Sequence, residues 1–147
     1  MRFKIIVKMK PEQEGVAPDP SMFEEMGKFN QSLVDAGILL AAEGLSGSKD
    51  GAIVTFRKGG KFEVKDGPFT EAKELVAGFW IIQVKSKAEA IEWVKRCPAP
   101  MGAGKDAEIE IRQVFEASDF PADAFPPEEQ AKEEALRAKI AKQHPNQ

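Results

Sequence analysis

The sequence predicts an α+β fold in which two helices cover a largely antiparallel sheet. Strand patterns outnumber helix patterns, in the order strand, helix, four strands, helix, strand. Two of the strands flank a Gly-Gly turn, and the short links between the others leave no room for repeated parallel crossovers. A content of 42% hydrophobic and 31% charged residues is typical of a globular domain.

The first strand and helix follow from hydrophobic period and turn chemistry. Residues 2–9 place apolar side chains at alternate positions, which indicates a half-buried strand. Residues 11–20 hold three prolines and predict a loop. A helix follows, with Ser21 expected as its N-cap and Gly37 as its stop. Residues 38–45 are expected to form the second strand.

The middle of the chain predicts a β-hairpin. Residues 52–57 and 61–65 flank Gly59-Gly60, a dipeptide that favours a tight turn. Phe56 and Phe62 lie symmetrically about the turn, so they are expected to share one face.

A strand, a helix and a last strand follow. Residues 74–84 contain the run Leu75–Ile82, which is apolar at both odd and even positions and predicts a strand buried on both sides. Ser86 is expected to cap a helix that ends near Cys97-Pro98. Residues 107–115 alternate again. Two helices can cover only one face of the sheet, so the other face predicts a homodimer with Leu75–Ile82 at its interface.

The chain is expected to divide into a domain at 1–115 and an extension at 116–147. Prolines at 121, 126 and 127 interrupt the pattern, and residues 128–142 then predict a C-terminal helix. Acidic residues begin this segment and lysines end it, as the helix dipole favours.

Composition excludes several classes of partner and site. The net charge is −3 and no basic stripe is present, so neither nucleic acid nor membrane is expected as a partner. The longest apolar run is far shorter than the ~20 residues of a membrane-spanning helix, and no signal peptide is expected. A single cysteine, Cys97, fits a reducing, cytoplasmic compartment. With His144 as the only histidine, neither a zinc or redox-metal site nor another cofactor is expected. Carboxylate oxygens suit Mg²⁺ or Ca²⁺, so a hard cation stays open as an alternative, although no EF-hand spacing is present.

The densest group of functional residues is the segment Asp66–Glu74. In one interpretation it is a rigid turn: Asp66 bonds nearby amides, Gly67 supplies a positive φ, and Phe69 anchors in the core. In the other, its carboxylates and lysine bind a small polar ligand or transfer a proton, with Asp66, Glu71 and Lys73 as candidate catalytic residues. The predicted ligand site is a cleft between sheet and helices, lined by Glu43, Asp66, Glu71, Lys73, Arg96 and Arg112.

One further segment is a weak candidate. Residues 102–106, Gly-Ala-Gly-Lys-Asp, resemble part of a phosphate-binding loop. Ala99 stands where that loop has its first glycine, and Asp106 replaces its Ser/Thr, so an ordinary loop is favoured.

The segment Asp-Gly-Pro-Phe-Thr-Glu-Ala-Lys-Glu at 66–74 closely resembles the signature of the DGPF proteins of the YCII-related superfamily. Gly78-Phe79-Trp80, Arg96-Cys97-Pro98 and Glu110-Ile111-Arg112 are similar to further family positions, and the resemblance covers residues 2–115. It departs at Ala77, where the family has Gly, and at Gln113, where it has Pro.

The resemblance implies a ferredoxin-like monomer that pairs into a dimeric α/β barrel, and a bacterial cytoplasmic protein often encoded beside an extracytoplasmic-function sigma factor. The family is largely uncharacterised, so no activity is implied. The YciI branch carries a His-Asp pair proposed as catalytic, which this chain lacks because its histidine is at 144.

Two classes of function remain. The first is a small-molecule binder or minor enzyme that uses the cleft. The second is a non-catalytic interaction module, linked to transcription through the sigma-factor association. An enclosed pocket with convergent charges would favour the first, and an exposed apolar patch would favour the second.

Overall fold

The computed structural model describes residues 1–145. The chain forms two compact units, of which the first is Met1–Gln113 and the second begins at Val114. Within the described residues, no helix combines the length and the hydrophobicity needed to cross a membrane.

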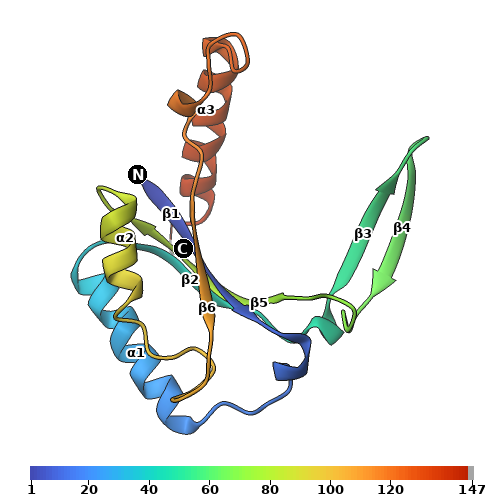
Figure 1. The fold of residues 1–147 in the computed structure, drawn as a ribbon. Coiled ribbons are helices and arrows are strands. Elements are labelled where there is room, and N and C mark those ends of the chain that lie inside the picture. The colour runs from blue at the N-terminus through green and yellow to red at the C-terminus, as the bar shows by residue number, and fades with distance from the viewer. Residues whose placement is uncertain (146–147) are drawn as a thin grey trace. The chain divides into compact units, whose positions relative to one another are not determined.

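Four strands form the main sheet of the first unit: β1 (Arg2–Met9), β2 (Leu39–Gly44), β5 (Leu75–Gln83) and β6 (Glu108–Gln113). Their order is β2-β5-β1-β6 (Figure 1). Every neighbouring pair is antiparallel, which confirms the predicted α+β class. β2 and β6 are free edges, so the sheet of one chain is open and does not close into a barrel.

Helices α1 (Pro20–Asp35) and α2 (Lys87–Val94) contribute to a single core on one face of this sheet. Phe29 of α1 meets Trp80 of β5 edge to face, with ring centroids 5.6 Å apart. The Trp80 indole N–H donates to Asn30 Oδ1 at 2.7 Å, so its polar end is satisfied. The buried apolar side chains are Phe3, Ile5, Val7, Phe29, Leu33, Trp80, Ile82, Val84 and Ala90.

The helix ends correct one prediction and confirm another. α1 is capped by Asp19, whose carboxylate accepts from the Ser21 amide at 2.9 Å, and not by Ser21 itself. Pro20 occupies the first helical position, where its fixed φ fits and its missing N–H costs nothing. Ser86 caps α2 as predicted and accepts from the Glu89 amide. The helix ends at Val94, before the predicted Cys97-Pro98, and a turn follows.

The prediction that β5 is buried on both sides is wrong for a single chain. Gly78, Trp80 and Ile82 face the helices and are buried, whereas Phe79 and Ile81 on the other face are only half-buried. The reason is that both helices pack on the same face. We call the uncovered side the open face; it carries Ile6, Val76, Phe79 and Ile81 together with charged side chains of β1 and β6.

The predicted hairpin forms as a separate two-stranded sheet. β3 (Ala52–Arg57) pairs with β4 (Lys61–Asp66), with Phe56 opposite Phe62. Gly59 and Gly60 have φ of 83° and 74°, which the turn requires. Figure 1 shows this hairpin standing apart from the four-stranded sheet.

The second unit contains α3 (Pro127–Gln143), close to the predicted 128–142. None of the residues of α3 is buried. Before it, three phenylalanine rings form a row: Phe115 lies 4.8 Å from Phe120, which lies 5.8 Å from Phe125. The Gln130 side-chain amide donates to the Phe125 carbonyl at 2.7 Å and ties this row to the first turn of the helix.

Candidate functional site

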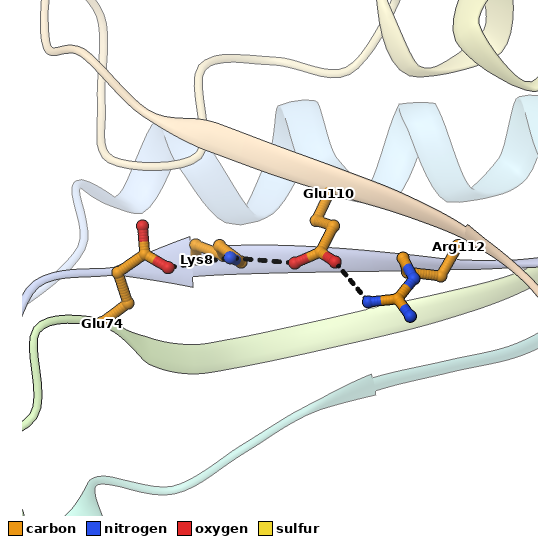
Figure 2. Close-up of polar contacts among 4 residues, drawn as sticks. All are labelled: Lys8, Glu74, Glu110 and Arg112. Atoms are coloured by element: carbon orange, nitrogen blue, oxygen red, sulfur yellow. Dashed lines mark hydrogen bonds and ion pairs between the residues drawn. The ribbon is translucent and has the colours of Figure 1, made fainter.

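A chain of ion pairs crosses the open face where β1 and β6 lie side by side (Figure 2). Lys8 Nζ lies 2.8 Å from Glu74 Oε2 and 2.8 Å from Glu110 Oε2. Arg112 Nη1 lies 3.0 Å from the other oxygen of Glu110. Glu110 pairs with Ile6 in the sheet register, so Lys8, two residues further along β1, reaches it on the same face.

The four charges of this chain stabilise one another. The hydrogen bond from Lys8, followed by that from Arg112, lowers the pKa of the Glu110 carboxyl. Hydrogen bonds to Glu110 and then to Glu74 raise the pKa of the Lys8 ammonium. Lys8 and Glu110 are therefore both charged near neutral pH, and both oxygens of Glu110 already have partners.

A cleft of about 970 Å³ lies next to these ion pairs, and Lys8 and Glu74 are among its lining residues. It is formed by the end of β1, the short 3-10 helix η1 (Pro11–Gln13), the segment before β5 and the segment before β6. Lys10, Lys73 and Lys105 form no ion pair within residues 1–145, whereas Lys8 is engaged by two carboxylates. The charged lining residues are Lys8, Lys10, Lys73, Lys105, Glu74, Asp106 and Glu108.

The segment that carries Lys73 into the cleft is fixed by contacts of Ser48, the one polar side chain among the buried residues of the described chain. Ser48 donates from its amide and its hydroxyl to the Glu14 carboxylate, both at 2.6 Å. The Phe69 amide donates to Ser48 Oγ at 3.0 Å, and the Gly67 amide to the Gly51 carbonyl at 2.9 Å. We call these five residues the Ser48 knot.

The knot corrects three details of the turn prediction. Gly67 has no positive φ; it is required because a Cβ there would overlap the Ser48 carbonyl. Asp66 is exposed and forms no hydrogen bond to the turn within residues 1–145. Phe69 is half-buried and packs outside the core cluster, because the turn lies on Gly51 and Ser48 and not on the helices.

The structure separates the six predicted site residues. Lys73 lines the large cleft, and Arg112 belongs to the ion-pair chain. Asp66 and Glu71 lie at the base of the hairpin, where Glu71 pairs with Lys65 at 3.2 Å.

The remaining two predicted residues lie beside the helices. Glu43 lines a pocket of about 250 Å³ together with Asn30, Trp80 and Met101. The Arg96 guanidinium stacks on the ring of Trp93 at 4.3 Å and borders a shallow hollow next to α1.

Sequence reasoning missed the other lysines of the cleft. Lys8 lies at a polar position of the alternating first strand, and Lys10 follows the end of that strand. In the sequence alone both look like ordinary solvent-exposed lysines. Lys105 belongs to the Gly-rich segment that resembles a phosphate-binding loop, which was the one signal for it. Only the pairing of β1 with β6 reveals that these residues border one cleft.

The described residues contain neither a cluster of metal-ligand side chains nor an activated thiol. Within residues 1–145, no three side chains of His, Cys, Asp and Glu converge in a way that could hold a metal ion. Burial raises the pKa of the Cys97 thiol to about 11, so it is protonated and a poor nucleophile at neutral pH.

Antiparallel topology, helices on one face and a charged cleft at the end of the central strand define a small α+β domain with a solvent-accessible polar site. A family model of the YCII-related domain matches residues 1–118. The chain therefore belongs to the YCII-related family. No curated protein matches the chain.

Proposed function

We propose that the protein is a homodimer that binds a small polar ligand, bearing at least one anionic group, in the lysine-lined cleft. The observation that carries this proposal is the set of three lysines that face the cleft without a carboxylate partner in residues 1–145. A carboxylate or phosphate oxygen accepts strong, charge-assisted hydrogen bonds from ammonium groups. Lys10, Lys73 and Lys105 come from three separate segments, so such a ligand would be held from several sides.

The acidic residues of the cleft narrow the ligand class. Asp106 and Glu108 also line it, without ion pairs in the described chain, and they can accept hydrogen bonds from hydroxyl or amino groups. A ligand with both an anionic group and donor groups fits better than a bare anion. Of the predicted catalytic residues Asp66, Glu71 and Lys73, the last lines this cleft, so any proton transfer on a bound ligand is assigned to Lys73.

The dimer is proposed through the open face. Val76 is 45% exposed there, and Ile6, Phe79 and Ile81 are half-buried. Apolar side chains of a sheet are stabilised when a second layer covers them. Two copies related by a two-fold axis would cover each other's open faces and close the dimeric α/β barrel that the ferredoxin-like topology allows.

Ligand binding is tested by the thermal stability of the full chain in the presence of inorganic phosphate, succinate and glycerol. A ligand that binds only the folded state raises the melting temperature in a saturable way. We expect this from phosphate and succinate and not from glycerol. Lys73→Ala and Lys105→Ala should reduce the effect, whereas Lys87→Ala, an exposed lysine of α2, should not. An equal rise in melting temperature in all three variants would exclude the cleft as the binding site.

Within the family, we propose the DGPF branch, a bacterial cytoplasmic setting and a functional domain spanning 1–115. Support comes from the signature at 66–74 and from the knot, in which Gly67 and Phe69 of that signature make close contacts with Ser48. The half-buried, protonated Cys97 fits a reducing compartment.

A second candidate function is that of a non-catalytic interaction module, linked to transcription through the sigma-factor association. The observation that favours it is the exposed apolar surface of the β3–β4 hairpin. Absence of ligand binding, together with retention of the dimer, would leave this second function as the better supported one.

A further inference from the structure

One face of the β3–β4 hairpin is apolar and uncovered. Val54 lies opposite Val64, and Phe56 opposite Phe62, so the four side chains share this face. They are 49%, 67%, 77% and 63% exposed in that order. The two phenylalanine rings lie 5.1 Å apart and meet edge to face. We call this surface the hairpin face.

Within residues 1–145 of one chain, the hairpin lacks a third strand and a layer packed on its apolar face. Neither of its strands pairs with the four-stranded sheet. A two-stranded ribbon alone in water is marginally stable, and it needs a third strand or a packed face to be stable. The hairpin face is the surface on which such packing is missing.

The charged residues of the hairpin favour the hairpin of a second copy as the partner that covers the hairpin face. On the opposite face, Arg57 pairs with Glu63 at 2.9 Å and Lys65 with Glu71 at 3.2 Å. Asp66 at the base and Lys58 at the tip form no ion pair within residues 1–145. A two-fold axis perpendicular to the strands makes the two hairpins run in opposite directions, so that the base of each lies beside the tip of the other. This arrangement brings Asp66 of each copy next to Lys58 of its partner, whereas an axis parallel to the strands would place like charges together.

We propose that the hairpin face packs against the hairpin face of a second copy of the chain, with Asp66 of each beside Lys58 of the other. This inference rests on the proposed homodimer and extends its interface. Burial of an aromatic side chain removes about 150–250 Å² from water. Phe56 and Phe62 are 77% and 63% exposed, so the four rings of a dimer offer roughly 400–700 Å² for burial. A stable interface buries about 1,200–2,000 Å². The hairpins therefore supply a substantial part, and the open faces supply the rest.

The first test is the dimer dissociation constant of the full chain, measured by sedimentation equilibrium. Phe56→Ser combined with Phe62→Ser should raise it at least a hundredfold, because two aromatic contacts are lost in each copy. Ile53→Ser is the matched control: Ile53 is 44% exposed and lies on the opposite face of the same ribbon. The control should change the constant less than threefold.

The second test is a charge exchange that leaves the apolar side chains in place. Lys58→Asp alone should weaken the dimer about tenfold, because it places two acidic groups beside each other. Lys58→Asp together with Asp66→Lys should restore it. Circular dichroism spectra that match the wild type show that each variant is folded.

The outcomes distinguish this inference from the proposed dimer itself. A wild-type chain that is monomeric at 100 µM overturns both. A wild-type dimer that is weakened neither by the phenylalanine variant nor by Lys58→Asp alone overturns the hairpin contact and leaves the open-face dimer standing. If wild type but not the phenylalanine variant sediments with phosphatidylcholine vesicles while the dimer persists, a lipid surface covers the hairpin face and the inference is wrong.

Discussion

Replacement of Gly67 by alanine is expected to destabilise the protein by about 3 kcal/mol. An ideal Cβ at this position would overlap the Ser48 carbonyl oxygen and lie 2.6 Å from the carbonyl carbon and 3.1 Å from Lys49 Cα. These are backbone atoms, so the turn has to move away from the Ser48 knot. Overpacking of this kind costs about 1–3 kcal/mol. The movement also weakens the bonds from the Gly67 and Phe69 amides, each worth about 1 kcal/mol.

Urea unfolding followed by circular dichroism measures the effect. With a slope of about 2 kcal/mol per molar urea, the loss moves the midpoint down by roughly 1.5 M. Gly27→Ala is the control, because Gly27 lies inside α1 with nothing within 4 Å of the added Cβ. That variant should be more stable than wild type by about 0.5–1 kcal/mol. A Gly67→Ala midpoint within 0.2 M or so of the wild type would refute the close-approach argument.

Three further predictions follow from the contacts described above. Ser48→Ala should lower the free energy of unfolding in urea by about 2 kcal/mol, because it removes a buried hydroxyl that donates to the Glu14 carboxylate and accepts from the Phe69 amide. The lowered pKa of Glu110 means that its interaction with Lys8 stabilises the fold above pH 4.5 and is lost as pH falls through the lower folded value; Glu110→Gln should flatten the pH dependence of stability in that acidic range. With its pKa raised to about 11, Cys97 should react with iodoacetamide at pH 8 at least ten times more slowly in the folded than in the urea-unfolded chain.

Local pattern was enough for the elements of the fold. Alternation at Phe3, Ile5 and Val7 predicted the central strand, and Gly59-Gly60 predicted the hairpin with its facing rings. The cap of α1 was misplaced by two residues because Asp19 and Ser21 are both good caps; Pro20 between them decides for the aspartate.

The site was much harder to predict than the fold. A cleft depends on which strands become neighbours, and no local pattern shows that β6 pairs with β1 and brings the loop of Lys105 near Lys10. Asp66 was predicted as a site residue because of its residue type, whereas the structure places it at the base of the hairpin, as the last residue of β4. Gly67 was recognised as important, but for its φ; the Ser48 carbonyl that actually requires glycine is distant in sequence and invisible before folding.

The bond between the Gly67 amide and the Gly51 carbonyl makes the hairpin a modular insertion. It joins the two ends of residues 52–66 at 2.9 Å, so the excursion begins and ends at almost the same place. Residues directly opposite each other in antiparallel strands have Cα atoms about 5.5 Å apart or closer, a gap that one or two residues can bridge. The hairpin thus leaves and rejoins the rest of the first unit at one place, and its strands pair with none of the four strands of the main sheet. A change in the length or sequence of residues 52–66 therefore alters the surface that the hairpin presents and leaves the strands of the main sheet paired as they are.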